Sequence, residues 1–174
     1  MKEITLPAII DNIPKVTAFI DEQLESLDCP MKAQMQIDVA VDEIFCNIAS
    51  YAYASGAANN GASESVFGEA ASGASESGFG EAVSGAKPAD SESAAVGEAT
   101  VRFSFEASSR LVSISFIDQG VPFDPLKKDD PNVTLSLEER QIGGLGIFLV
   151  KKSMDNMTYR YENDQNILTI QKKI

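Results

Sequence analysis

The chain of 174 residues contains no histidine and only two cysteines, Cys29 and Cys46. Without histidine it can supply neither an imidazole base, nor an imidazole metal ligand, nor a phosphorylated histidine of its own. Two cysteines so far apart are too few for a disulfide framework or a zinc site. We therefore interpret both as reduced thiols, and we expect any catalytic base to be another type of side chain.

Long apolar runs and basic charge are also scarce. No stretch approaches the roughly 20 apolar residues of a membrane span, and the N-terminus starts without the apolar region of a signal peptide. We expect a cytoplasmic protein that makes no membrane contact. The 14 basic residues are outnumbered by 26 acidic ones, for a net charge of -12. Because phosphate contacts require clustered Lys and Arg, this charge argues against nucleic acid as a direct partner.

Residues 55–99 differ from the rest because they are almost wholly Ala, Gly, Ser and Glu. They contain a tandem 12-residue repeat at 61–72 and 73–84, with a partial copy at 91–99. Such a sequence buries too little apolar surface to offset its ordering entropy. We therefore predict a flexible, low-complexity insertion within a single domain that spans residues 1–174.

Outside this segment the hydrophobic pattern predicts an α+β fold. Alternating residues predict strands, and apolar residues three and four apart predict helices. The expected strands are 2–7, 100–106, 111–118, 157–162 and 166–173. Asp11 or Asn12 is the expected cap of a first helix. A second helix is expected over 31–54, and a third from near Gly146 to near Asp155. Because the strands are joined as hairpins and the helices are segregated, we predict a two-layer sandwich: a mostly antiparallel mixed sheet with helices on one face.

One polar pair stands out on the second expected helix. Glu43 and Asn47 are four residues apart and therefore share a face of the helix. That face lies roughly opposite the apolar stripe that includes Val41, Ile44 and Phe45. Taken alone, such a pair is more often two solvated polar residues than a functional site.

Asp118 ends an apolar strand and is followed by Gln-Gly-Val-Pro-Phe-Asp-Pro. A carboxylate at a strand end can accept a hydrogen bond, and Gly120 lets a flat ring approach the backbone. The alternative is a plain turn, because Asp, Gly and Pro are common turn residues.

The run Gly143-Gly144-Leu145-Gly146 opens the third expected helix. Glycines at a helix start leave backbone N–H groups free to face an anion, which the helix dipole also favours. The spacing fits neither a dinucleotide-binding fingerprint nor a P-loop, which has Lys-Ser/Thr after its last glycine. A tight turn before the helix stays open as the alternative.

The order and spacing of these motifs resemble the Bergerat-type ATPases. This superfamily includes histidine-kinase catalytic domains, gyrase, MutL-type repair ATPases and bacterial anti-sigma serine kinases. The matching stretches are VDEIFCNIASYAY at 41–53, FIDQGVPFDP at 116–125 and IGGLGIFLVKKSMD at 142–155. Within the superfamily the chain resembles the anti-sigma regulatory factor group of serine-protein kinases, whose members are small and single-domain.

The resemblance implies a role for each matching polar residue. Glu43 matches the acidic, catalytic residue that polarises an attacking water or substrate hydroxyl. Asn47 matches the residue that holds Mg²⁺ together with the ATP phosphates. Asp118 matches the carboxylate that accepts the adenine amino group, and Gly120 allows the base to approach closely.

The same resemblance implies a phosphate site and a lid. Gly143, Gly144 and Gly146 match the backbone cradle for the phosphates. Arg140 is the cation expected within a mobile lid over residues 126–141. The motif residues assigned to the ATP site with them are Phe123, Leu145 and Ile147.

One departure from the family concerns the second expected helix. Many relatives carry a basic residue or histidine three or four positions after the asparagine, where this chain has Ser50 and Tyr51. The departure removes a cation that could stabilise the phosphates.

The resemblance implies an ATP-dependent kinase. It would transfer the γ-phosphate to a serine of an anti-anti-sigma (STAS-type) protein and sequester a sigma factor. A non-catalytic ATP-binding switch stays open, as does a detached histidine-kinase catalytic domain, which would need another protein's histidine. DNA work of the gyrase or MutL kind is disfavoured by the acidic charge. Whether the protein forms a homodimer also stays open.

Overall fold

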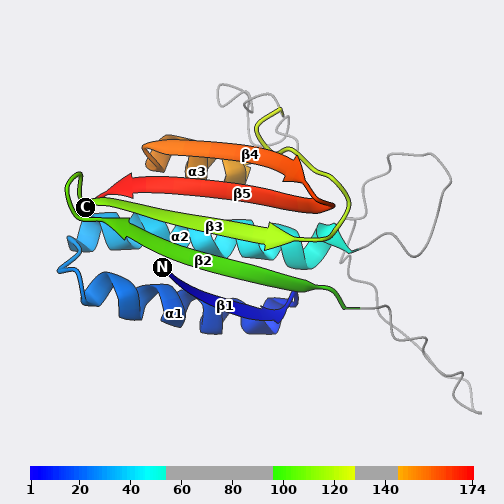
Figure 1. Cartoon of the computed structure of the whole chain (residues 1–174), viewed down its shortest axis with the longest axis horizontal. Coiled ribbons are helices and arrows are strands. Elements are labelled where there is room, and N and C mark those ends of the chain that lie inside the picture. Colours follow the sequence, from blue (N-terminus) through cyan, green and yellow to red (C-terminus); the bar gives the residue numbers. More distant parts are fainter. Residues whose placement is uncertain (54–95, 128–144) are drawn as a thin grey trace, which may run out of the picture.

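The computed structural model describes residues 1–53, 96–127 and 145–174. This part of the chain forms a sheet covered by helices (Figure 1). The strands are β1 Lys2–Pro7, β2 Glu98–Glu106, β3 Leu111–Asp118, β4 Asn156–Glu162 and β5 Gln165–Lys173. The helices are α1 Ile13–Glu25, α2 Met31–Asn47 and α3 Leu145–Ser153, with a 3-10 turn η1 at Ile10–Asn12 and a π-helical turn η2 at Ile48–Ala52. Most of the predicted insertion and of the predicted lid lies outside the described residues.

The described strands form one sheet in the order β1-β2-β3-β5-β4, and every neighbouring pair is antiparallel. The α+β prediction is therefore confirmed, and the described sheet is antiparallel throughout rather than mixed. Short turns join two of these pairs, β2 to β3 and β4 to β5. Asn163 and Asp164 join β4 to β5 with φ angles of 53° and 58°, as a two-residue turn of the type I′ kind requires.

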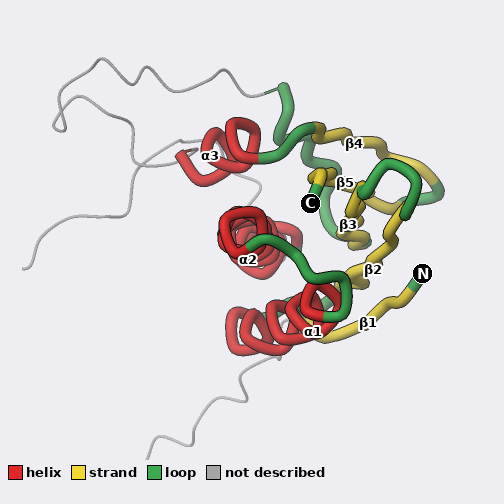
Figure 2. Tube along the Cα trace, turned by 90° about the vertical axis from the view of Figure 1, so that its left-hand side faces the viewer, coloured by secondary structure: helices red, strands yellow, loops and turns green. Residues whose placement is uncertain are grey.

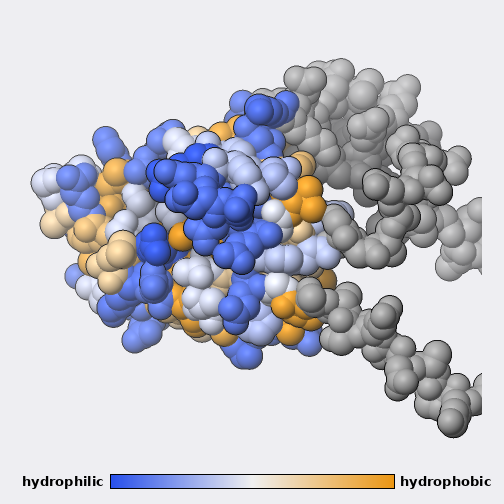
Figure 3. Space-filling view, turned by 45° about the vertical axis from the view of Figure 1, so that its right-hand side comes forward, coloured by the Kyte–Doolittle hydropathy of each residue, from blue (hydrophilic) through white to orange (hydrophobic). Residues whose placement is uncertain are grey.

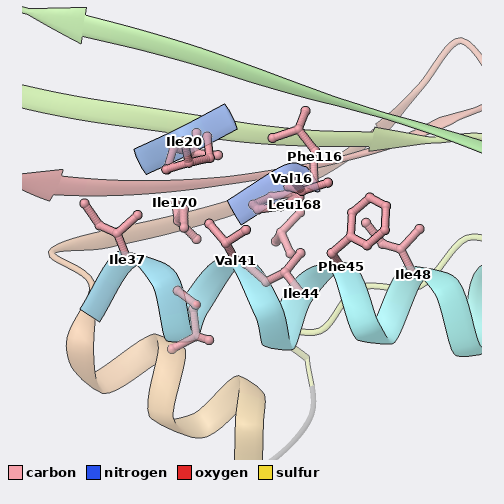
Figure 4. Close-up of a cluster of buried hydrophobic side chains, with 14 of the residues drawn as sticks. Val16, Ile20, Ile37, Val41, Ile44, Phe45, Ile48, Phe116, Leu168 and Ile170 are labelled. Carbon is pink, nitrogen blue, oxygen red and sulfur yellow. The ribbon is translucent and has the colours of Figure 1, made fainter. Parts of the chain in front are cut away.

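Viewed along the sheet, α1, α2 and α3 lie side by side in one layer and the strands form the other (Figure 2). The middle helix, α2, packs against both of the others. Its apolar face points at the sheet (Figure 4), and its Val41 and Phe45 belong to one buried cluster with Phe116 of β3. Full burial of one such side chain stabilises the fold by about 1.5–3 kcal/mol. This packing fixes the rotation of α2 and leaves the face of Glu43 and Asn47 toward α3.

Two details of the helices differ from the predictions. Asn12 does not cap α1 with its side chain: its Nδ2 donates to Pro7 O over 2.9 Å, and its Oδ1 accepts from Lys15 Nζ over 2.8 Å. The second helix does not run as one α-helix to residue 54 but changes to η2 after Asn47. Asn47 donates its side-chain Nδ2 to Glu43 O, 2.8 Å away, and such back-bonding competes with the regular helical ladder.

The described surface seen in Figure 3 is mainly hydrophilic, with separate smaller apolar areas. Among the residues that the structure places, no helix is both long enough and apolar enough to cross a membrane.

Candidate functional site

A cavity lies where the end of α2, the end of β3, the start of α3 and the β4–β5 hairpin come together. Its lining is mostly apolar or aromatic, with a carboxylate and two side-chain amides among it. The lining residues are Ile44, Asn47, Ile48, Tyr51, Ala52, Asp118, Phe123, Pro125, Ile147, Tyr159, Asn166 and Leu168. An apolar cavity with a few placed polar groups suits a flat ligand whose edge can form hydrogen bonds.

Asp118 is the acidic group of this cavity, and only 6% of the residue is exposed. Its Oδ1 accepts two hydrogen bonds of 2.9 Å, from Gly120 N and from Asn166 Nδ2. Burial raises the pKa of the carboxyl, and the two hydrogen bonds act in the opposite direction. Oδ2 accepts no hydrogen bond from the described residues, so it is the oxygen left to accept one from a ligand.

Asn166 holds this arrangement together. Besides its bond to Asp118, its Nδ2 lies 3.3 Å from Gly120 O and 3.2 Å from Val121 O. Its Oδ1 accepts from Tyr159 Oη over 2.7 Å and from Phe123 N over 3.2 Å. Asn166 is not among the predicted site residues. It pairs with Asp118 across β3 and β5, and this pairing cannot be read from the order of the residues.

Glu43 and Asn47 lie on the side of α2 that faces α3, and both are half-buried. The Glu43 carboxylate lies against Gly146, where a β-carbon would overlap Oε2 of Glu43. Asn47 lines the cavity one turn further on, and its Oδ1 accepts no hydrogen bond within the described part of the chain. The structure thus brings Glu43, Asn47 and Gly146 together. The side chains of Glu43 and Asn47 are therefore not fully solvated.

Gly120 has a packing role in addition to the predicted one. A β-carbon there would overlap the backbone oxygen of Ala52 at the end of η2. The next residue, Val121, donates its N–H to the same oxygen over 2.9 Å. The close approach seen at Gly120 is therefore that of η2, and the approach of a nucleobase stays a prediction.

The other predicted site residues divide into three groups. Phe123 and Ile147 line the cavity, and Phe123 is 59% exposed. Leu145 is exposed and does not line it. The predicted residues that lie outside the described part of the chain are Arg140, Gly143 and Gly144. Tyr51, at one position where relatives carry a cation, lines the cavity and is 71% exposed.

The donor set fits a magnesium nucleotide better than a metal held by protein alone. In the described ranges no three acidic, cysteine or histidine side chains cluster as a metal site would require. Mg²⁺ bound with a nucleotide takes most of its ligands from phosphates and water and needs only one or two protein oxygens. The Asn47 side chain offers an amide oxygen of this type in the cavity that Asp118 also lines; its role as a Mg²⁺ ligand stays a prediction.

Comparison with known proteins shows two matches to this chain. A family model of the histidine kinase-like ATPase domain matches residues 56–172. Serine/threonine-protein kinase BtrW from Bordetella bronchiseptica (strain ATCC BAA-588 / NCTC 13252 / RB50) is 29% identical over 72 residues, which are 41% of this chain and 51% of that protein. The chain thus spans about half the length of the curated relative that it matches.

Because the family model covers more than half of it, this chain belongs to the histidine kinase-like ATPase family. The superfamily resemblance and the class of function, an ATP-binding, kinase-like domain, are confirmed. The matched segment begins after α2 and η2, so Glu43 and Asn47 precede it. Their roles are those that the resemblance implies, and they stay predictions.

Proposed function

We propose that this chain is a serine-protein kinase that binds Mg²⁺-ATP in the cavity beside Asp118. The observation that carries the proposal is the state of that carboxylate. Its Oδ1 is held by Gly120 and Asn166, and its Oδ2 is left to accept a bond from a ligand. An adenine ring would lie among the apolar and aromatic lining with its 6-amino group toward Oδ2. We further propose one domain, with residues 55–99 as an insertion.

The phosphates would extend from the base toward the start of α3. Asn47 Oδ1 would share in holding Mg²⁺, which neutralises phosphate charge when bound. Backbone N–H groups of Gly143, Gly144 and Gly146 would face the phosphates, and Arg140 would add a cation. The support is the position of Gly146, beside Glu43 and at the α3 end of the cavity.

Glu43 would act as the general base. It would take the proton from a serine hydroxyl while the hydroxyl oxygen forms a bond to the γ-phosphorus and the bond from that phosphorus to the ADP oxygen breaks. A base that acts in this way contributes about 10²–10⁴-fold to the rate. Its carboxylate accepts no hydrogen bond and forms no ion pair within the described residues, so nothing there competes for the incoming proton.

The proposed substrate is a serine of an anti-anti-sigma (STAS-type) protein, and the proposed second partner is a sigma factor in the cytoplasm. The support is the resemblance to the anti-sigma regulatory factor group, together with a relative named as a serine/threonine-protein kinase. A non-catalytic ATP-binding switch is the alternative that Tyr51 favours, because a neutral ring stands where relatives carry a cation.

The testing experiment is phosphate transfer from γ-labelled ATP. The full chain is incubated with Mg²⁺-ATP and with each STAS-domain protein of the same genome, beside versions whose candidate serine is replaced by alanine. We expect label on one partner and none on its alanine version. ATP binding without transfer to any partner would exclude the kinase and leave the switch.

A further inference from the structure

Tyr53 ties together three segments that are distant in the sequence. It directly follows η2, and its hydroxyl donates to Glu98 O at the start of β2 over 2.6 Å. The same hydroxyl accepts the N–H of Gln119, just beyond β3, over 3.0 Å. The ring lies over Gly97, where a β-carbon would overlap the ring. One side chain, carried just beyond η2, thus contacts both the start of β2 and the residue after β3.

The hydrogen bond from Gln119 N to the Tyr53 hydroxyl is the contact that involves Asp118. This N–H belongs to the peptide group that joins Asp118 to Gln119, so the Tyr53 hydroxyl restrains the backbone on the C-terminal side of Asp118. One residue before Tyr53, Ala52 O accepts the N–H of Val121 over 2.9 Å. The turn that carries Asp118 is therefore bonded to η2 and Tyr53 on both sides of Gly120.

Tyr53 is not among the residues that line the cavity. Both hydrogen bonds of its hydroxyl lie in exposed surroundings, where water can replace a lost partner. Removing the hydroxyl therefore leaves few unsatisfied groups and costs little stability. The Asp118–Gln119 peptide would then lose its hydrogen bond to a group that the protein holds in place. A water molecule that replaced the hydroxyl would be free to move, and so would the peptide.

We propose that Tyr53 is a positioning residue for nucleobase recognition: its hydroxyl fixes the Asp118–Gln119 peptide and so aims Oδ2 of Asp118 at the base. This inference rests on the proposed function, because it assigns the residue that orients the acceptor of the adenine amino group. Tyr53 should therefore affect the affinity only of ligands that form a hydrogen bond with Asp118.

The test compares two ligands that differ only at this contact. ATP carries the 6-amino group, and purine ribonucleoside triphosphate lacks it. Binding of each with Mg²⁺ is measured by calorimetry on the full chain, its Tyr53→Phe variant and its Tyr161→Phe variant. Tyr161 is the matched control, because it is exposed and its hydroxyl forms no hydrogen bond within the described residues.

We expect Tyr53→Phe to weaken ATP binding about tenfold, the size of one well-placed hydrogen bond. Binding of the analogue should change less than about twofold, and Tyr161→Phe should affect neither ligand. Equal loss for both ligands would overturn the inference, because it would indicate a general structural role. Unchanged ATP affinity in Tyr53→Phe would overturn it too. A wild-type chain that binds no ATP would overturn the proposed function and this inference with it.

Discussion

The carboxylate of Glu43 lies against Gly146, and the missing side chain of that glycine makes the space that the carboxylate fills. The two residues come from different helices, α2 and α3, which pack side by side. The contact therefore places the proposed base at the start of the helix that would face the phosphates. A glycine at this point of α3 lets the carboxylate keep that position.

Gly146→Ala should reduce phosphate transfer while leaving the fold intact. The new β-carbon would overlap Oε2 of Glu43, which is the far end of a flexible side chain and can move aside. Alanine also favours a helix over glycine by about 1 kcal/mol. We expect the free energy of unfolding in urea to stay within about 1 kcal/mol of wild type or to rise. Transfer should fall at least about tenfold, because the base loses its position.

The control for this variant is the same change made in a Glu43→Gln background. If Gly146→Ala acts through the carboxylate, it should cause no further loss of transfer there, since groups that act as a unit are not additive. A full second loss would show that Gly146 acts on the phosphates independently of Glu43.

Glu43→Gln should separate binding from transfer. The amide keeps the size of the side chain but cannot take a proton, so transfer should fall by about 10²–10⁴-fold. The affinity for Mg²⁺-ATP should change little, because Glu43 does not line the cavity. Glu25→Gln, an exposed change in α1, is the matched control for assay and stability. Unchanged transfer in Glu43→Gln would remove Glu43 from the proposed role.

Local patterns in the sequence were enough to predict the elements of this fold. Strands β2 and β3 were found from period-two alternation, and the buried face of α2 from apolar residues three and four apart. These signals are local because a side chain's direction follows the backbone that carries it. The site was only partly predictable, because its contacts cross between elements.

Contacts between distant elements could not be predicted from the sequence. Asn166 lies beside Asp118 only because β5 is inserted between β3 and β4. Glu43 meets Gly146 only because α3 packs against α2. Tyr53 reaches Glu98, 45 residues along the chain. None of these pairings follows from spacing, since each depends on the tertiary arrangement of separate elements.

Asp38→Asn should stabilise the protein near neutral pH. Burial, followed by the charge of Asp21, raises the pKa of Asp38 from 3.8 to about 6. One carboxylate oxygen, Oδ1, is buried without a hydrogen-bond partner. The folded state therefore holds this proton more tightly than the unfolded state does, and stability falls as the pH rises from about 4 to about 6.

The gain from Asp38→Asn should be about 1 kcal/mol at pH 7. A shift of this size in a fully buried group would be worth about 3 kcal/mol, and exposure to solvent reduces it. Urea unfolding at pH 7 and at pH 3 is the measurement, and the acid arm is the control. The gain should vanish at pH 3, where Asp38 is protonated in both states. An equal gain at both pH values would show that charge is not the cause.

Replacing residues 54–95 with a short Gly-Ser linker should preserve the fold and ATP binding. The ring of Tyr53 lies over Gly97, so the ends to be joined are already close, and shortening a loop changes its closure entropy only slowly. We expect the free energy of unfolding to change by less than about 1 kcal/mol and ATP affinity, measured by calorimetry, by less than about twofold. Loss of ATP binding in a folded variant would show that the insertion contributes to the site.

The central claim is that Asp118 accepts a hydrogen bond from the 6-amino group of adenine, and Asp118→Asn tests it most directly. The single oxygen of asparagine should stay with the N–H donors of Gly120 and Asn166, which leaves its NH₂ group toward the ligand. Calorimetry of the full chain should then show ATP affinity reduced at least about 100-fold, because two donors face each other. Inosine triphosphate, with an oxygen at this position, should bind the variant better than ATP does. Unchanged ATP affinity in Asp118→Asn would contradict the claim.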